Sequence, residues 1–120
     1  RAPDELHTLL LLSSSSNKPL ITLWTASWCR SCAIVSPLLK ELIEDKGVGE
    51  AEGGLGFAEI ELAASTIGDL GVTYAITSIP TLLAFSRGEP QTETRVNRLE
   101  DLKSRDFLER WLRVEAARGG

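Results

Sequence analysis

The chain has 120 residues, of which 42% are hydrophobic and 25% are charged, with a net charge of −4. This composition is typical of one globular domain, here residues 1–120, and excludes a disordered or collagen-like chain. No apolar run approaches the ~20 residues of a membrane span, and the basic residues are mostly scattered. We therefore expect no membrane anchor and no nucleic-acid partner.

The first half of the chain predicts a helix, a strand and a second helix. Residues 4–12 have a helical composition, and the serines at 13–16 should end that helix in a loop. Residues 19–26 (PLITLWTA) are apolar without alternation, as in a strand that is covered on both faces. Apolar residues recur every three or four positions over 30–45, and Pro37 predicts a kink in that helix.

The second half predicts three more strands and two more helices. Residues 47–56 contain five glycines and predict a flexible connection, whereas 57–62 (FAEIEL) alternate as a strand with Glu59 and Glu61 on one face. A short helix weakened by two glycines follows over 66–74. Finally, 81–97 predict two strands around a turn at Arg87-Gly88, the second at a sheet edge, and an amphipathic helix begins after Ser104. Strands that alternate with helices in this order favour an α/β fold, with a mixed sheet packed between helices.

Both cysteines lie in "WCRSC", Trp28 to Cys32. A bridge between residues so close together stabilises a fold little, which argues against a purely structural disulfide. A closed zinc site needs four ligands, and the rest of the chain offers only His7 as a good nitrogen donor, so we expect no metal site within one chain. A redox centre is the favoured interpretation of the pair.

The expected strand and helix place Cys29 at a helix N-terminus and Cys32 inside the first turn. The helix dipole and the neighbouring Arg30 both favour negative charge on Cys29, each by ~0.3–1 kcal/mol. Cys29 is therefore the predicted attacking thiolate, and Cys32 is the thiol that resolves the mixed disulfide. Trp28 either shields this pair from solvent or belongs to the core, and the sequence favours neither interpretation.

The pattern resembles the thioredoxin family across nearly the whole chain, from about residue 4 to residue 116. The resemblance rests on "WCRSC" after an apolar strand, Pro37 in the next helix, "SIPT" (residues 78–81) and Gly88 in the hairpin. It implies a thioredoxin-like fold with a central mixed four-stranded sheet flanked by helices, the family's usual first strand being absent. It also implies that Pro80 is a cis-proline, that the Ile79 backbone pairs with a substrate strand, and that Trp28 belongs to the docking surface.

Some positions depart from the family pattern. Arg30 and Ser31 replace the usual Gly-Pro, and the added positive charge should make the disulfide more oxidising. Leu23 stands where the family usually places a buried aspartate that assists the resolving thiol. As a hypothesis, Glu59 replaces that carboxylate as a buried proton acceptor, the alternative being a solvent-facing or ion-paired glutamate.

These features predict a thiol–disulfide oxidoreductase, which acts on protein disulfides through Cys29 and Cys32 without a bound cofactor. A thioredoxin reductase is a candidate electron donor, and we expect a monomer in the cytoplasm or in mitochondria. Two other classes stay open: a thioredoxin-like binding module with little turnover, and a dimer bridged by a metal ion or cluster through two cysteines from each chain.

Overall fold

The computed structural model describes residues 3–62 and 70–119. Its first half contains helix α1 (Pro3–Ser16), strand β1 (Leu20–Thr25), helix α2 (Arg30–Lys40) with a π-helical turn (Glu41–Asp45), a 3₁₀ turn (Glu50–Glu52) and strand β2 (Gly56–Glu61). The second half contains α3 (Leu70–Thr73), β3 (Thr81–Ser86), β4 (Glu89–Pro90), a 3₁₀ turn (Thr92–Thr94), α4 (Leu99–Leu102) and α5 (Arg105–Ala116). No described helix has the length and apolar character needed to cross a membrane.

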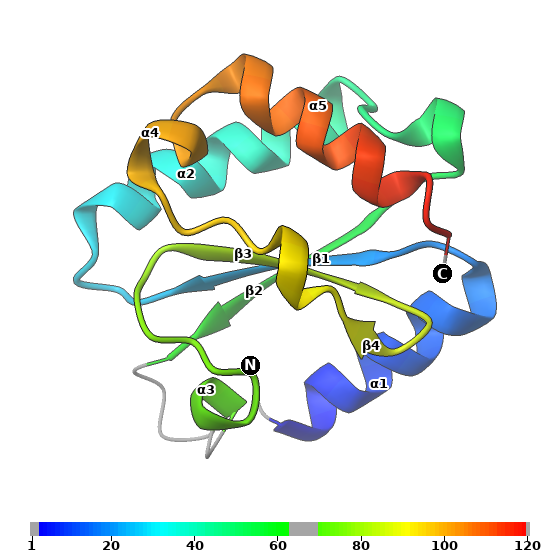
Figure 1. The fold of residues 1–120 in the computed structure, drawn as a ribbon, viewed down its shortest axis with the longest axis horizontal. Coiled ribbons are helices and arrows are strands. Elements are labelled where there is room, and N and C mark those ends of the chain that lie inside the picture. Colours follow the sequence, from blue (N-terminus) through cyan, green and yellow to red (C-terminus); the bar gives the residue numbers. More distant parts are fainter. Residues whose placement is uncertain (1–2, 63–69, 120) are drawn as a thin grey trace.

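The four described strands form one mixed sheet in the order β2-β1-β3-β4 (Figure 1). β1 pairs in parallel with β2, with Leu23 opposite Glu59, and antiparallel with β3, with Trp24 opposite Thr81. Helices α2, α4 and α5 cover one face, whereas α1 and α3 lie on the other. The prediction of a mixed α/β sheet between helices is confirmed, with β1 as its central parallel strand.

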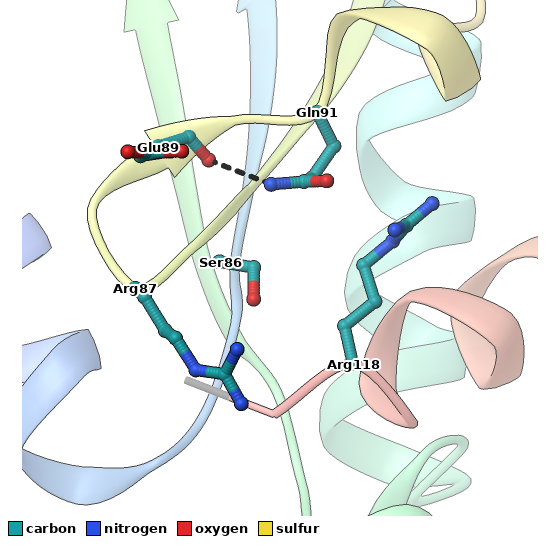
Figure 2. Close-up of a pocket in the computed structure, with 5 residues that line it drawn as sticks. All are labelled: Ser86, Arg87, Glu89, Gln91 and Arg118. Carbon is teal, nitrogen blue, oxygen red and sulfur yellow. Dashed lines mark hydrogen bonds between the residues drawn. The ribbon is translucent and has the colours of Figure 1, made fainter.

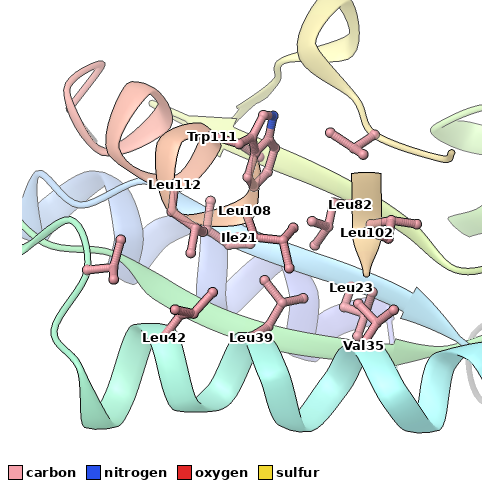
Figure 3. Close-up of a cluster of buried hydrophobic side chains, with 13 residues drawn as sticks. Ile21, Leu23, Val35, Leu39, Leu42, Leu82, Leu102, Leu108, Trp111 and Leu112 are labelled. Atoms are coloured by element: carbon pink, nitrogen blue, oxygen red, sulfur yellow. The ribbon is translucent and has the colours of Figure 1, made fainter. Parts of the chain in front are cut away.

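Two hydrophobic clusters hold these layers together, and β1 contributes to both. Ile21 and Leu23 face the larger cluster, where they meet Val35 and Leu39 of α2 and residues of α4 and α5 (Figure 3). The alternate residues Leu20 and Trp24 pack instead against α1, β2 and β3 in the second cluster. Because consecutive strand residues point to opposite faces, a strand covered on both sides is apolar at most positions instead of alternating, as the sequence predicted.

Helix α1 is longer than predicted, because it continues through the serine run. The hydroxyls of Ser15 and Ser16 both donate hydrogen bonds to the carbonyl of Leu12, at 3.1 and 2.8 Å. Serine side chains that bond back to the preceding turn are compatible with a helix. The expectation that these serines end the helix was therefore wrong.

Three other segments differ in detail from the prediction. The loop over 47–56 is not a featureless flexible connection: it contains a 3₁₀ turn, and a Cβ on Gly49, whose φ is 92°, would lie 3.2 Å from the Cβ of Ala116. The second hairpin strand is interrupted after Pro90 by the 3₁₀ turn, and it returns to β3 only where Val96 bridges Leu82. The helix predicted over 66–74 is found as α3, while its residues 66–69 lie outside the described part of the chain.

Candidate active site

The cysteine pair lies where the central strand ends and α2 begins. After β1 the chain turns, with the Cys29 N–H donating to the carbonyl of Ala26 at 3.0 Å. Cys29 is then the N-cap residue of α2, with extended backbone angles, and its Sγ accepts the N–H of Cys32 at 3.2 Å. The two cysteines form a disulfide, with their Cα atoms 5.3 Å apart. This confirms the predicted placement of Cys29 at the helix N-terminus and of Cys32 within the first turn.

The two sulfur-bearing residues differ in their exposure. Cys32 is only 2% exposed and lies on the inner side of α2, whereas Cys29 is half-buried. An incoming disulfide can therefore reach Cys29 more readily than Cys32. The helix N-terminus also offers unpaired backbone N–H groups that stabilise a negative charge on the outer sulfur.

A cis peptide lies at the end of the sheet that carries the cysteines. The Ile79–Pro80 bond is cis, and β3 begins immediately afterwards at Thr81, opposite Trp24 near the end of β1. The Thr81 hydroxyl donates to the carbonyl of Ser78 at 2.7 Å, which closes the turn around the proline. The predicted cis-proline is confirmed.

An apolar groove of about 290 Å³ joins these two segments. Trp28 and Ala26 line it from the cysteine loop, and the segment before the cis-proline lines it through Ile76, Thr77, Ser78 and Ile79, with Leu62 directly after β2. Trp28 is 72% exposed, so the interpretation of this residue as core was wrong. An exposed tryptophan beside an apolar groove is a suitable contact for a protein partner.

The acidic face of β2, which carries Glu59 and Glu61, approaches the site, and both carboxylates accept hydrogen bonds. Glu59 Oε1 accepts the hydroxyl of Ser36 at 2.7 Å and lies 2.9 Å from Lys40 Nζ, while its side chain is 31% exposed. The hydrogen bond and the charge of Glu59 raise the pKa of Lys40 above its usual 10.5. Glu59 is thus half-buried and ion-paired, which agrees with the alternative of an ion-paired glutamate rather than with a fully buried carboxylate. Its neighbour Glu61 accepts the backbone N–H of Ser27 at 3.0 Å and so holds the loop that leads to Cys29.

Comparison with known proteins agrees with this geometry. The thioredoxin family model matches residues 7–112 of the chain, which include the cysteine pair and the cis-proline. The chain belongs to the thioredoxin family. Thioredoxin from Mycobacterium tuberculosis is 31% identical over 76 residues, which are 63% of this chain and 60% of that protein. Mitochondrial thioredoxin from Mus musculus is 27% identical over 99 residues, 82% of this chain and 52% of that protein.

These curated thioredoxins are matched over only 60% or less of their own length. A solved structure, that of a mutant thioredoxin from Halobacterium salinarum NRC-1, superposes on the chain with a TM-score of 0.68 at 23% identity. The match covers 91% of this chain and 84% of that structure. The similarity confirms the thioredoxin-like fold.

The structure thus brings most of the residues predicted for this thioredoxin-family site to one end of the sheet. Trp28 and Ile79 line the same groove, and Arg30 is the exposed first residue of α2. Sequence reasoning missed the polar partners around them. Lys40 and Ser36 could have been found from their four-residue spacing on α2, but no signal in the sequence pointed to their contact with β2.

A larger polar cavity, of about 460 Å³, lies at the opposite end of the sheet (Figure 2). Ser86 at the end of β3, Arg87 and Arg118 line it together with Glu89 and Gln91. Leu20 at the start of β1 pairs with Phe85, so this cavity lies a full strand length away from the cysteines. Acidic side chains balance its arginines, because Glu89 lines the same cavity and Glu115 pairs with Arg118. It therefore presents no excess of charge that would select an anion.

Proposed function

We propose that this protein is a thiol–disulfide oxidoreductase that acts on protein disulfides. The reduced Cys29 thiolate attacks one sulfur of the substrate disulfide, which forms a Cys29–substrate disulfide and releases the other substrate sulfur as a thiolate. The Cys32 thiol loses its proton and attacks Cys29 Sγ, which releases the second substrate thiol. The substrate gains two electrons, and the Cys29–Cys32 pair becomes the disulfide. A dithiol donor then reduces the pair, for which a thioredoxin reductase is our candidate.

One observation carries this proposal: the more exposed cysteine occupies the N-cap of α2, while its partner lies buried one turn along. This asymmetry supports different roles for two otherwise equivalent thiols. The apolar groove between Trp28 and Ile79 supports a protein substrate. An extended substrate segment could pair with the backbone beside the cis-proline, as a strand added to an exposed edge does.

The proton that leaves Cys32 needs an acceptor, and Glu59 is the side chain to test for this role. It pairs with the buried Leu23 across β1 and β2, and its hydrogen-bond partner Ser36 lies four residues after Cys32 on α2. These contacts place a carboxylate on the α2 side of the sheet. Its pairing with Lys40 argues for a structural role instead, and the rate at which Glu59→Gln protein releases a mixed disulfide decides between the two.

Trapping the mixed disulfide tests whether Cys29 attacks the substrate and Cys32 resolves the mixed disulfide. Reduced Cys32→Ser protein, mixed with insulin, should retain insulin covalently, because no second thiol is left to release it. The matched Cys29→Ser variant should retain much less, since its remaining thiol is buried. If Cys29→Ser trapped insulin and Cys32→Ser did not, the assigned roles would be reversed.

A binding module with little turnover is the second candidate, and the buried Leu23 favours it, because a leucine cannot accept a proton. Insulin reduction by dithiothreitol separates the two: an oxidoreductase accelerates it catalytically, whereas a binding module holds insulin without acceleration. A metal- or cluster-bridged dimer would instead reveal bound metal in the reduced protein. We further propose that residues 1–120 act as a single domain and as a monomer, in the cytoplasm or in mitochondria.

A further inference from the structure

The segment that leads into the cis-proline begins with an unusual helix end. The N–H of Ala75 donates to the carbonyl of Val72 at 3.1 Å, and the N–H of Ile76 donates to the carbonyl of Gly71 at 2.8 Å. This is the hydrogen-bond pattern of a Schellman motif that closes α3. The motif needs a left-handed residue at Ala75, whose φ is 56°. Glycine is the usual residue there, because a Cβ disfavours this conformation.

A side chain from a distant part of the sequence contacts this alanine. Arg95 Nη1 donates a hydrogen bond to the carbonyl of Ala75 at 3.1 Å, across 20 residues of sequence. The bond is charge-assisted, and such bonds are stronger than those between neutral groups. Among the side chains that the structure describes, those of residues 6–62 and 71–119, none forms an ion pair with Arg95, and the partner shown for this guanidinium is the Ala75 carbonyl.

Arg95 is well placed to act as a fixed support, because the residues on both sides of it are tied to the core. The indole N–H of Trp111 donates to the carbonyl of Thr94 at 2.8 Å. Val96 exchanges two backbone hydrogen bonds with Leu82, at 3.0 and 2.8 Å. Leu82 lies two residues after the cis-proline, so Arg95 connects the strand that follows the proline with the loop that precedes it.

We propose that Arg95 is a positioning residue for the docking loop, residues 75–79, which it fixes by stabilising the left-handed conformation of Ala75. The inference rests on the proposed function, because this loop lines the groove next to Trp28 and carries the Ile79 backbone. When the bond is lost, Ala75 can relax toward negative φ, which shifts the residues that follow it. Protein substrates, which need the groove, should then bind more weakly, while chemistry at the cysteines continues.

The test compares Arg95→Ala with two rescue variants and one control. We expect Arg95→Ala to raise the KM for insulin about threefold to tenfold, the scale of one ordinary hydrogen bond because this one is exposed to solvent, with kcat nearly unchanged. Arg95→Lys should recover much of the affinity, because an ammonium can still donate to the carbonyl. Adding Ala75→Gly to Arg95→Ala should also recover it, since glycine favours the left-handed conformation without support. Arg98→Ala, which removes an exposed neighbouring charge, is the matched control.

Further measurements keep the inference separate from the proposed function. Amide hydrogen exchange at Ile76, whose N–H donates to the Gly71 carbonyl, should be faster in Arg95→Ala and restored by Ala75→Gly, whether or not the protein reduces insulin. Reduction of hydroxyethyl disulfide, which is too small to need the groove, should be unchanged, as should the Cys29–Cys32 potential.

Unchanged exchange, no rescue by glycine, or equal losses on both substrates would overturn the inference. A loss of insulin affinity that disappears at high salt would also overturn the inference, because it would show that Arg95 acts by attracting the charge of the substrate. Failure of the wild-type protein to reduce insulin would overturn only the proposed function.

Discussion

The Arg118→Ala substitution tests the energetics of a buried charge in this fold. Glu115 on α5 is fully buried, and its Oε1 accepts a hydrogen bond from Arg118 Nε at 2.8 Å. Its other oxygen, Oε2, has no hydrogen-bond partner in the described part of the chain. The carboxylate therefore depends on Arg118, whose side chain is 34% exposed.

Removing one partner of a buried pair leaves a buried charge, which typically costs about 3–5 kcal/mol. Arg118 is partly exposed, so water that enters the vacated space can solvate part of the carboxylate. We therefore expect a loss near the lower end, about 3 kcal/mol of unfolding free energy. The same helix provides a control, because Arg113 and Glu109 form an i,i+4 pair in which both side chains are exposed, 53% and 38%. Arg113→Ala should cost no more than about 0.5 kcal/mol.

Urea unfolding of the oxidised variants, followed by circular dichroism, measures both losses. A double-mutant cycle isolates the ionic contribution, because the neutral amide of Glu115→Gln no longer needs a cation. In that background we expect Arg118→Ala to cost under about 1 kcal/mol. If Arg118→Ala cost no more than Arg113→Ala, the reasoning about the buried charge would be refuted. An equally large cost in the Glu115→Gln background would instead show that Arg118 acts through apolar packing.

Three further predictions concern the site. In glutathione buffers the Cys29–Cys32 pair should have a reduction potential above the about −270 mV of thioredoxin. Arg30→Gln should lower this potential by about 6–20 mV, because Arg30 stabilises the reduced pair by ~0.3–1 kcal/mol. A rise in the potential on substitution would contradict this reasoning. The Lys40 pKa, measured by NMR, should exceed 10.5 and return toward it in Glu59→Gln. Since the folded-state value is the raised one, the stability that the pair contributes is fully present below pH 10.5 and is lost as the pH rises through the Lys40 pKa. Ala75→Gly alone should stabilise the protein by about 0.5–1 kcal/mol in urea unfolding, and no gain would show that its φ of 56° is unstrained.

The sequence predicted the parts of the fold that hydrophobic periodicity determines. β1 is apolar at nearly every position because it lies at the centre of the sheet, and α5 has its apolar face where Leu108 and Leu112 enter the core. Ser104 was the expected N-cap, and its hydroxyl accepts the N–H of Phe107 at 3.2 Å. Such local patterns need no knowledge of the tertiary structure.

The errors arose where distant contacts or alternative hydrogen bonds decide the outcome. Serines weakly oppose helix formation, yet the helix continues through Ser16, whose hydroxyl donates to carbonyls of the preceding turn. Trp28 could not be assigned to core or surface, because its exposure depends on how the loop before α2 leaves the sheet. The contact of Arg95 with Ala75 joins residues 20 apart, and no periodic pattern encodes a contact between two loops.

The position of Glu59 bears on which step of the proposed cycle is most altered in this chain. Leu23 is fully buried at the position that the resemblance assigns to a buried aspartate, and the carboxylate directly opposite it in the sheet is Glu59 on the neighbouring strand. There, the Ser36 hydroxyl and the Lys40 ammonium both stabilise its charged form. A carboxylate held in this way is poorly suited to take a proton from Cys32, so release of the mixed disulfide should be slow compared with attack by Cys29. Glu59→Gln should then change the release rate little, whereas a tenfold slowing would identify Glu59 as the acceptor despite its ion pair.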